Sequence, residues 1–491
     1  MMKNPPDIRS RFILFLPYEA IRDMAVPAAV ARLLEDYSTQ RSDLAEDAAK
    51  VREVTGKDAP TEARVRAIML HDETGVLQAV IPESTILDLD RLNEGAGRNL
   101  RALPLAELDE LRKRLQWYEV PALPDLTGCE AVIDARLSAF EEIYLPSSEE
   151  DKYLCMSRRL FEAAMGAVKS MQISVRLPEI AVNHNQPAKD MDQINKAISS
   201  FTSLRIQRRL EDTLEMPPLP ETAQRIIKLR VDPEAGISEL ADIVETDPSL
   251  SAQVVSWASS SFYAAPGKIR SVHDAIVRVL GFDLVMNLSM GLALGRTLEV
   301  PEERGDGFTP YWEQSVWTAT LCGALTTAIP KERRPEFGLA YLVGLLHNFG
   351  YLVLAHVFPP HFSLICRYSE ANRHVDSENC EQYLLGITRE QMGGKLMEMW
   401  NMPEEVCMAL RYQKNPYYNG DYSVYSALLF VATQLLRKHG IGEGPAQPAP
   451  QSVWDYLGLT RERAEEVLQE LLSMSEDMKS LADNLAEATR S

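Results

Sequence analysis

A cluster of prolines, Met216-Pro217-Pro218-Leu219-Pro220, divides the chain into two stretches with different sequence patterns. Proline lacks the backbone donor that a helix needs and pushes the residue before it out of the helical region, so no helix runs through this point. Before the cluster, short apolar runs alternate with turn residues, and after it helical periodicity continues as far as Tyr412. A chain of 491 residues also exceeds what one core usually serves, so we expect two or three domains.

The charge of the chain limits what it can bind. Lys and Arg number 51 against 71 for Asp and Glu, which gives a formal charge of −20. That sign opposes binding of a phosphate backbone over a broad surface. The cysteines show no C-x-x-C spacing, which favours reduced thiols in a cytoplasmic protein over a disulfide framework or a zinc site. They are Cys129, Cys155, Cys322, Cys366, Cys380 and Cys407.

Two apolar stretches bear on whether the chain enters a membrane. Phe12 to Leu16 is short, lacks a cleavage pattern and is followed by charged residues, so it does not predict a signal peptide. Phe337 to Val357 approaches membrane-spanning length, but it contains His347, Asn348 and His356. We interpret it as a buried core helix and expect no association with a membrane.

The N-terminal stretch predicts an α+β domain with a mixed sheet. Arg64 to Leu70 and Val76 to Ile81 have the composition of strands, and Asp72-Glu73-Thr74-Gly75 between them is typical of a hairpin loop. The other expected elements are strands at Ala131 to Ala135 and Glu142 to Leu145 and a helix at Leu103 to Leu115.

The second stretch predicts an all-α domain. The polar segment Val182 to Lys189 reads as a linker, and Asp190 to Leu214 as a connecting helix that ends at the prolines. Asp247 before Pro248 has the chemistry of a helix N-cap, since its side chain accepts from the first free backbone N–H groups. Ser271 is expected to cap the next helix, and Gly281 to end it in a left-handed conformation.

The C-terminal tail carries an apolar seam with steps of three and four residues, which is typical of about three heptads. The seam consists of Ala464, Val467, Leu471, Met474, Met478, Leu481 and Leu485. We expect it to pack on the body of the same chain, because three heptads is near the lower limit for an independent seam. The alternative is a coiled coil that forms a homodimer.

The chain from Met216 onward resembles the HDOD family, a branch of the HD phosphohydrolase superfamily. The resemblance rests on six segments in order: MPPLPETAQRIIKL (Met216 to Leu229), ELADIVETDPSLSAQVVSWASSSFY (Glu239 to Tyr263), RSVHDAIVRVLGFDLV (Arg270 to Val285), YWEQSVWTA (Tyr311 to Ala319), LVGLLHNFGYLVL (Leu342 to Leu354) and MWNMPEEV (Met399 to Val406). It implies a helical signalling or adaptor module of bacterial regulatory proteins, whose partners are other proteins.

An HD hydrolase holds divalent cations with a histidine on one helix, an adjacent His-Asp pair on another and a further aspartate. The matching positions here, with two further histidine positions of the wider superfamily, are Gln314, His347, Asn348, Arg389 and Gln413. Only His347 keeps a ligand side chain. The neutral amide of Asn348 cannot supply the anionic bridge of two-metal hydrolysis, and Arg389 would bring a permanent positive charge. The resemblance thus implies a degenerate site without a metal or another cofactor.

His347 is then most simply a core histidine bonded to a neighbouring backbone group. The other histidines of this region, His356, His361 and His374, do not have the steps of three or four that place ligands on one helical face. They predict no second metal site.

The N-terminal stretch resembles the YbaK family of aminoacyl-tRNA deacylases from about Ala25 to Gly166. The matching strings are RVRAIMLHDETGVLQAVIP (Arg64 to Pro82), ILDLDRLN (Ile86 to Asn93) and EAVIDARL (Glu130 to Leu137). In that family a lysine on the first strand helps to hold the aminoacyl ester, and Arg66 matches it here. The glycines that the family has before the third strand are missing from Trp117 to Pro124.

Arg66 and Asp134 each have two interpretations. A fork-shaped guanidinium does not replace a compact ammonium in a tight pocket, so Arg66 is either a functional residue or a strand residue that pairs with an acid such as Glu62. Asp134 lies inside an expected strand, where aspartate is depleted, and either serves a site or caps a turn.

These observations predict five parts. They are an N-terminal extension (1–24), a YbaK-like domain (25–166), a linker with a connecting helix (167–214), an HDOD domain (215–416) and a C-terminal helical tail (417–491). The leading hypothesis is a cytoplasmic bacterial regulatory protein whose YbaK-like domain senses a small molecule or an aminoacyl-tRNA end. The first alternative is an active aminoacyl-tRNA deacylase, and a metal-dependent phosphohydrolase is the second.

Overall fold

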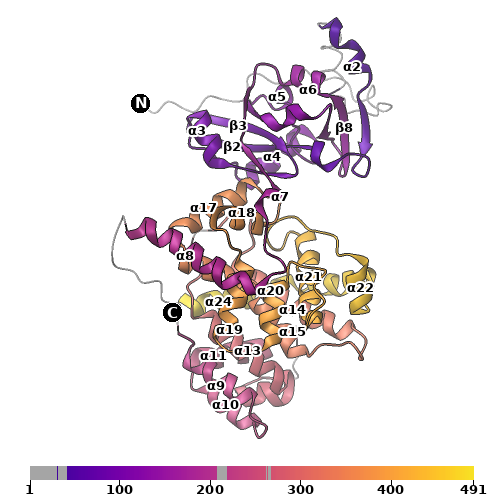
Figure 1. Cartoon of the computed structure of the whole chain (residues 1–491). Helices are drawn as coiled ribbons and strands as arrows, with labels where there is room; N and C mark the ends of the chain where they lie inside the picture. Colours follow the sequence, from indigo (N-terminus) through magenta and orange to yellow (C-terminus); the bar gives the residue numbers. More distant parts are fainter. Residues whose placement is uncertain are drawn as a thin grey trace, which may run out of the picture. The chain divides into compact units, whose positions relative to one another are not determined.

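The computed structural model describes residues 30, 41–206, 218–260, 263, 267–302 and 304–490. The expected N-terminal extension, the run from Phe12 to Leu16, the end of the connecting helix and Met216-Pro217 lie outside the described residues. The chain divides into two compact units, each described here by itself (Figure 1). Unit 1 comprises Met1–Thr85 and Leu89–Ser174, and unit 2 comprises Ile86–Asp88 and Val175–Ser491.

Unit 1 contains a five-stranded mixed sheet. Its order is β5 (Arg101–Ala102), β2 (Val65–Asp72), β3 (Gly75–Pro82), β6 (Glu130–Asp134) and β9 (Lys169–Met171). β2 and β3 are antiparallel and paired from Val65 with Pro82 to Asp72 with Gly75. The predicted hairpin is therefore confirmed. β6 lies parallel to β3 and to β9, which makes the sheet mixed as predicted.

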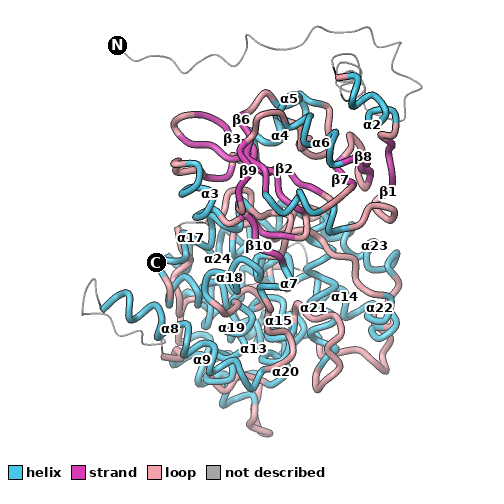
Figure 2. The backbone as a smooth tube through the Cα atoms, turned by 45° about the horizontal axis from the view of Figure 1, so that its top comes forward, coloured by secondary structure: helices cyan, strands magenta, loops and turns pink. Residues whose placement is uncertain are grey.

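A second, antiparallel sheet has the order β1 (Arg52–Thr55), β8 (Lys152–Ser157) and β7 (Glu142–Pro146). The helices of unit 1 are α2 (Ala45–Ala49), α3 (Leu89–Ala96), α4 (Leu105–Leu115), α5 (Pro124–Thr127) and α6 (Arg158–Met165). α6 packs against β7 and β8, and Figure 2 shows these helices beside the strands. The apolar side of α4 faces β2, because Leu111 and Met69 are buried in one cluster.

The sheet of unit 1 continues beyond residue 166, where the sequence places the end of this domain. β9 pairs with β6 through Val132 and Lys169, Ile133 and Ser170, and Asp134 and Met171. Its sequence, Lys-Ser-Met, is short and exposed in two of three positions, so it lacks the apolar alternation that identifies a strand. Another pair, β4 (Thr85–Leu87) and β10 (Ser174–Arg176), forms a two-stranded sheet.

Unit 2 is helical. Its helices are α7 (Leu177–Ile180), α8 (Asp190–Ile206), α9 (Glu221–Arg230), α10 (Ile237–Glu245), α11 (Pro248–Ala258), α12 (Val272–Ala275), α13 (Phe282–Gly295), α14 (Tyr311–Ala328), α15 (Phe337–Leu346), α16 (Phe349–Val357), α17 (Pro359–Ala371), α18 (Ser377–Leu385), α19 (Arg389–Met399), α20 (Glu404–Tyr412), α21 (Ser423–Lys438), α22 (Gln451–Leu457), α23 (Arg461–Leu472) and α24 (Ser475–Arg490). One large apolar cluster, to which helices from α8 to α24 contribute, forms the core.

The predicted N-caps are present in this unit. The Asp247 side chain accepts from the backbone N–H of Leu250 at 3.0 Å, and Ser271 accepts from Asp274 at 3.0 Å. Gly281 ends its helix with a positive φ of 81°, as expected for glycine, but its ψ of 166° lies outside the left-handed helical region that the sequence predicts. A second detail differs from the prediction, because Ile276–Leu280 before this glycine is π-helical.

The apolar stretch Phe337–Val357 is long enough to cross a membrane, and it is the one such candidate among the described residues. It forms two core helices, α15 and α16, and 94% of its most apolar window is buried inside the protein. The prediction of buried core helix is confirmed, with a break at His347 and Asn348 that the sequence does not predict.

The C-terminal seam packs on its own chain. Ala464, Val467, Leu471, Met478, Leu481 and Leu485 are buried in the core of unit 2, and Met474 packs against it. α23 and α24 both contact α14, so the tail completes the helical unit instead of standing apart from it. The interpretation of the seam as an intrachain contact is confirmed, and its apolar side is not free for a second chain.

Candidate functional site

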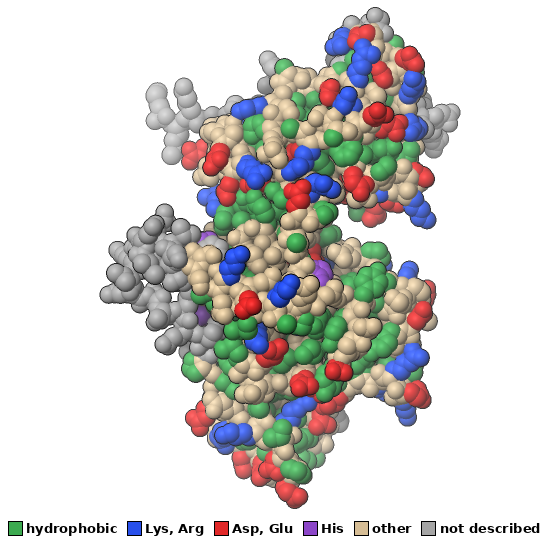
Figure 3. Space-filling view, viewed as in Figure 1, with side chains coloured by type: hydrophobic (Ala, Val, Ile, Leu, Met, Phe, Trp, Pro, Cys, Tyr) green, Lys and Arg blue, Asp and Glu red, His purple; other side chains and the backbone are tan. Residues whose placement is uncertain are grey.

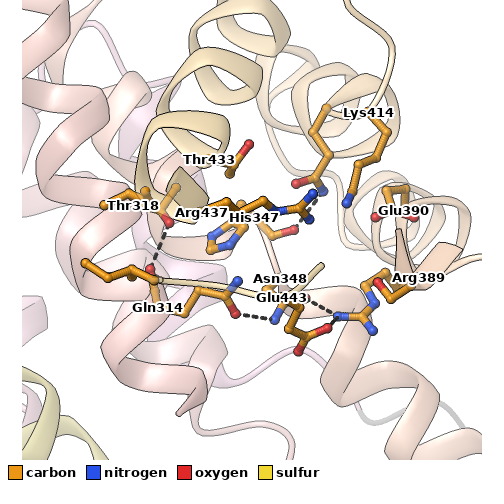
Figure 4. Close-up of a pocket in the computed structure, with 14 residues that line it drawn as sticks. Gln314, Thr318, His347, Asn348, Arg389, Glu390, Lys414, Thr433, Arg437 and Glu443 are labelled. Carbon is orange, nitrogen blue, oxygen red and sulfur yellow. Dashed lines mark hydrogen bonds and ion pairs between the residues drawn. The ribbon is translucent and has the colours of Figure 1, made fainter. Parts of the chain in front are cut away.

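The five positions that the family resemblance singles out meet at one small cavity in unit 2 (Figure 4). Gln314 comes from α14, His347 and Asn348 from the break between α15 and α16, Arg389 from the first turn of α19, and Gln413 from the end of α20. The cavity measures about 20 Å³, which is space for about one water molecule. A larger cavity of about 920 Å³ adjoins it and shares Gln314, Asn348 and Glu443 with it.

Glycines let the helices around the cavity approach closely. A Cβ at Gly344 would lie 2.6 Å from the Cα of Ala319, and a Cβ at Gly350 would lie on the carbonyl group of Arg389. No side chain fits at either position without movement of backbone. These contacts place α15 against α14 and α16 against α19, and so bring Asn348 next to Gln314 and Arg389.

His347 is buried and neutral. Its Nδ1 lies 2.7 Å from the carbonyl oxygen of Gly344, and because a carbonyl only accepts, Nδ1 carries the proton. Burial is the main cause that lowers the pKa of His347 to about 3; the nearby cations Lys414, Arg437 and Arg389 act in the same direction, and the hydrogen bond to Gly344 opposes them. The predicted backbone bond of this histidine is confirmed. Its Nε2 is then an unprotonated acceptor, and it has no hydrogen-bond partner among the described residues.

Asn348 joins two of the other positions through its amide. The Nδ2 group donates to Oε1 of Gln314 at 2.9 Å, and Oδ1 accepts from Nη1 of Arg389 at 3.1 Å. Both ends of the amide are therefore used in bonds inside the protein. Gln413 is also used, since its Nε2 donates to the carbonyl oxygens of His347 at 2.8 Å and Leu410 at 3.0 Å.

Arg389 supplies the positive charge of the site. Its guanidinium is buried and binds the carboxylates of Glu381, through Nε, and Glu443, through Nη1 at 2.9 Å. It also lies 5.1 Å from the ring centre of Tyr351. Burial disfavours the charge, but the carboxylates outweigh it and hold the pKa of Arg389 well above its usual value. The guanidinium is a permanent cation in this pocket.

A second buried ion cluster lies beside the first. Asp376, which is almost fully buried, accepts from Nζ of Lys414 at 2.6 and 2.7 Å and from Nη1 of Arg437 at 2.6 Å. Although burial opposes it, these two cations keep the pKa of Asp376 well below its usual range. Sequence reasoning missed Asp376, Glu381 and Glu443, since each pairs with a residue eight or more positions away. The signal that could have found them is the need of a buried arginine for carboxylates.

The side chains present do not fit a metal centre. Among the residues that the structure describes, no group of three or more His, Cys, Asp or Glu side chains is placed to hold a metal ion. At the cavity itself, His347 offers one nitrogen and Glu390 one carboxylate oxygen without a hydrogen-bond partner in the described part of the chain, while Glu443 already binds the guanidinium of Arg389. A cation would have to displace Arg389 or share a small space with its charge.

The segment that leads into unit 2 is bonded to α19 and α20. Arg411 pairs with Asp190 at the start of α8 and donates to the backbone oxygen of Asn183 at 2.8 Å. Gln391, two residues after Arg389, donates to Asp190 at 2.8 Å and to Gln193 at 2.8 Å. The helix that carries Arg389 therefore also holds the linker.

Arg66, the candidate catalytic residue of unit 1, lies on β2 and is half-buried. Its Nη2 binds Glu83 at 3.2 Å and Glu119 at 3.0 Å. Glu62, the partner suggested from sequence, is not among its ion pairs. The observed partners are Glu83, just after the end of β3, and Glu119, which follows α4. Although burial opposes it, the pKa of Arg66 is raised by Glu119 and Glu83. The two carboxylates satisfy most of its charge.

Asp134 caps a turn, as one of its two interpretations predicts. Its Oδ1 accepts from the backbone N–H of Arg136 at 2.8 Å, and its Oδ2 accepts from Ile173 at 2.9 Å. The side chain is almost fully buried and both oxygens are in use. The six cysteines are free thiols, five of them buried.

Fold and cavity together define a helical domain of the HD type that follows a mixed-sheet domain. Residues 216–416 match the model of the HDOD domain, and the chain belongs to the family of HDOD-domain proteins. A solved structure from Marinobacter aquaeolei VT8, a candidate signal transduction protein, is 48% identical with a TM-score of 0.85. The match covers 94% of this chain and 100% of that one.

Two more distant relatives match parts of the chain. An uncharacterized protein of Treponema pallidum is 22% identical over 261 residues, which are 52% of this chain and 48% of that protein. The chain thus spans about half the length of this curated relative. The structure of a candidate trans-editing enzyme for prolyl-tRNA synthetase is 16% identical and covers 30% of this chain and 96% of that one, with a TM-score of 0.24. A likeness of that size does not determine what unit 1 binds.

Proposed function

We propose that unit 2 is a binding module that works without hydrolysis and passes a signal to a protein partner. The observation that carries this proposal is the place of Arg389, whose guanidinium is clamped by Glu381, Glu443 and Asn348 where the superfamily holds metal. The guanidinium of Arg389 supplies at this position a positive charge that a divalent ion would otherwise bring. Since the guanidinium has no exchangeable water, it cannot generate the nucleophile that a metal-bound water provides.

The whole chain is proposed to act in bacterial signalling in the cytoplasm. The Marinobacter relative, which aligns over its full length, is named for signal transduction. Free thiols at all six cysteines agree with a reducing compartment. Unit 1 would sense a small molecule or an aminoacyl-tRNA end, and the linker held by Arg411 and Gln391 would carry the change to α19. The degenerate site would then serve as a rigid anchor for the helices.

The active deacylase remains the alternative for unit 1, but no contact favours it. A residue that holds an aminoacyl ester needs a free donor. The Nη2 group of Arg66 is already shared between Glu83 and Glu119, whereas its Nε is buried without a hydrogen-bond partner among the described residues. A ligand would have to compete with both carboxylates.

The test is elemental analysis of the full chain after incubation with manganese, iron or zinc, followed by phosphodiester hydrolysis assays. We expect less than one ion in ten chains and no turnover above background. The matched control is the variant Gln314→His, Asn348→Asp, Arg389→His and Gln413→His, which restores ligand types at the family positions and should gain metal. Two tightly bound ions per wild-type chain, with turnover on the order of 1 per second, would overturn the proposal.

A further inference from the structure

Four tyrosines form a surface on unit 2 that the proposed function does not use. The tyrosine surface consists of Tyr417, Tyr418, Tyr422 and Tyr456. Tyr417 is 73% exposed, Tyr456 48% and Tyr422 41%. In the isolated chain these rings expose a large apolar area to water. Exposed tyrosines of this kind are enriched where proteins bind one another.

Two of the four rings, those of Tyr418 and Tyr456, are held in place before anything binds. Tyr418 stacks on Tyr412 with centroids 3.8 Å apart and planes 4° from parallel, and its hydroxyl donates to the carbonyl oxygen of Asp421 at 3.0 Å. The Tyr456 hydroxyl lies 2.9 Å from that of Ser423, which follows Tyr422 at the start of α21. Side chains that are already ordered lose less entropy on binding, so they give more net affinity.

Acidic side chains lie near one of these rings, that of Tyr422. Glu405 and Glu404, at the start of α20, raise the pKa of Tyr422, and Asp421 contributes further. Among the described residues, none of these three carboxylates has an ion-pair partner. The cation beside Tyr456 is Arg333, which donates to the backbone oxygens of Asp455 and Tyr456. The surface is therefore aromatic and, around Tyr422, negative.

We propose that the tyrosine surface docks an arginine- and lysine-bearing segment of a protein partner. Cations bind the faces of tyrosine rings, and the free carboxylates complement their charge. Nucleic acid and anionic lipid carry the wrong charge for this surface. A second copy of a chain with net charge −20 is a poor match as well. Figure 3 shows hydrophobic side chains with both acidic and basic ones among them on the face of unit 2 that carries α20, α21 and α22 in the same view as Figure 1.

The surface adjoins the degenerate site along the chain. Gln413 and Lys414 line the central cavity, and the next residue, Asn415, donates to Asn185 of the linker at 2.6 Å. Tyr417 follows two positions later, with its backbone N–H bonded to Asn415 Oδ1 at 3.0 Å. This inference rests on the proposed function of unit 2 as a binding module, and it names the chemistry of the partner.

The test measures binding of fluorescent nona-arginine, nona-lysine and nona-glutamate peptides to the full chain by anisotropy in 0.15 M salt. We expect nona-arginine to bind more tightly than nona-lysine, because the guanidinium stacks on aromatic rings, and nona-glutamate not to bind. The double variant Tyr417→Ala and Tyr422→Ala should weaken nona-arginine binding at least tenfold. Glu404→Gln with Glu405→Gln should weaken it several-fold and reduce its dependence on salt.

The matched control is Tyr118→Ala in unit 1, where a tyrosine that is 52% exposed also bonds an acid, Glu150, at 2.9 Å. Its binding of nona-arginine should equal that of the wild type. If the Tyr417 and Tyr422 variant binds as the wild type does, or loses no more than the Tyr118 variant, net charge alone explains the binding and the inference is wrong. Absence of nona-arginine binding has the same meaning. Either result leaves the metal content of unit 2 unchanged, so failure of this inference is distinct from failure of the proposed function.

Discussion

Two arginines occupy the positions at which the two family resemblances place functional residues, and each lies between two glutamates. Arg389 binds Glu381 and Glu443 in unit 2, and Arg66 binds Glu83 and Glu119 in unit 1. The side chain of Arg389 is 8% exposed, whereas that of Arg66 is 21% exposed. The same chemical arrangement is thus almost closed to water in unit 2 and partly exposed to it in unit 1.

Burial decides what such an arrangement can do. In unit 2 the three charges have no alternative partner in water, so the set is stable only when it is complete, and it acts as a structural element. In unit 1 water competes with each ion pair, which makes exchange of a glutamate for a ligand inexpensive. The difference predicts a rigid pocket around Arg389 and an adaptable one around Arg66.

The largest effect is expected when the buried set is broken. Arg389→Met leaves Glu381 and Glu443 without their cation, and we expect unit 2 to lose about 3 to 5 kcal/mol of unfolding free energy. Arg66→Met is the matched control in unit 1 and should cost about 1 kcal/mol or less. Urea unfolding followed by tryptophan fluorescence measures unit 2, which contains Trp257, Trp312, Trp317, Trp400 and Trp454. Equal losses in the two variants would remove the distinction between the two sites.

Close packing around Arg389 gives the next largest effect. A Cβ at Gly350 would collide with the carbonyl of Arg389, which is backbone and cannot rotate away. Gly350→Ala should therefore destabilise unit 2 by about 1 to 3 kcal/mol. In unit 1, a Cβ at Gly95 would meet only the flexible end of Met171. Gly95→Ala should be neutral within about 1 kcal/mol in either direction, because alanine favours a helix. A thermal shift in Gly350→Ala no larger than in Gly95→Ala would contradict the rigid pocket.

Acid should weaken unit 2 through His347. The pKa of this residue is about 3 in the folded chain, below its usual value of about 6.5, so between these limits the unfolded state binds the extra proton. Stability from His347 is then complete above pH 6.5 and falls as the pH decreases, by up to about 1.4 kcal/mol per unit. His347→Asn keeps a donor for Gly344 and does not titrate. Unfolding curves from pH 7 to pH 4 should diverge between wild type and variant, and parallel curves would show that His347 is not buried as a neutral ring.

The smallest effect concerns the activity of unit 1. Because Arg66 is already neutralised, Arg66→Ala should change neither stability by more than about 1 kcal/mol nor deacylation of mischarged tRNA, which should be at background in both proteins. Assays across a panel of mischarged tRNAs measure this directly. Deacylation by the wild type that disappears in Arg66→Ala would show that Arg66 is catalytic. Unit 1 would then be an enzyme, whereas the Arg389 site of unit 2 would be a structural element.

The parts of the fold that follow from local chemistry could be predicted from the sequence. The caps at Asp247 and Ser271 and the hairpin before Gly75 each depend on residues that are neighbours in the chain. The five family positions could also be placed together, because the motif order fixes the helices that carry them. The strand at Lys169–Met171 could not, since its pairing with β6 comes from a distant segment and not from its own pattern.

The partners of the site residues could not be predicted from the sequence either, because they also come from distant segments of the chain. Arg389 appears from the sequence only as a charge that repels a metal ion, whereas in the structure its guanidinium binds the carboxylates of Glu381 and Glu443. Glu443 lies outside the segment that matches the HDOD model, in the loop after α21. Reading the family motif alone therefore omits one of the two carboxylates that bind Arg389.

The ion pair between Asp190 and Arg411, with Gln391 bonded to the same aspartate, bears on how ligand binding in one unit is coupled to binding in the other. These contacts hold the linker on the helices that frame the central cavity. Under the proposed function, a ligand of unit 1 that releases the linker would change the affinity of unit 2 for its partner. Thermodynamic reciprocity then requires the partner of unit 2 to change the affinity of unit 1 for its ligand by the same factor. The coupling therefore acts equally in both directions.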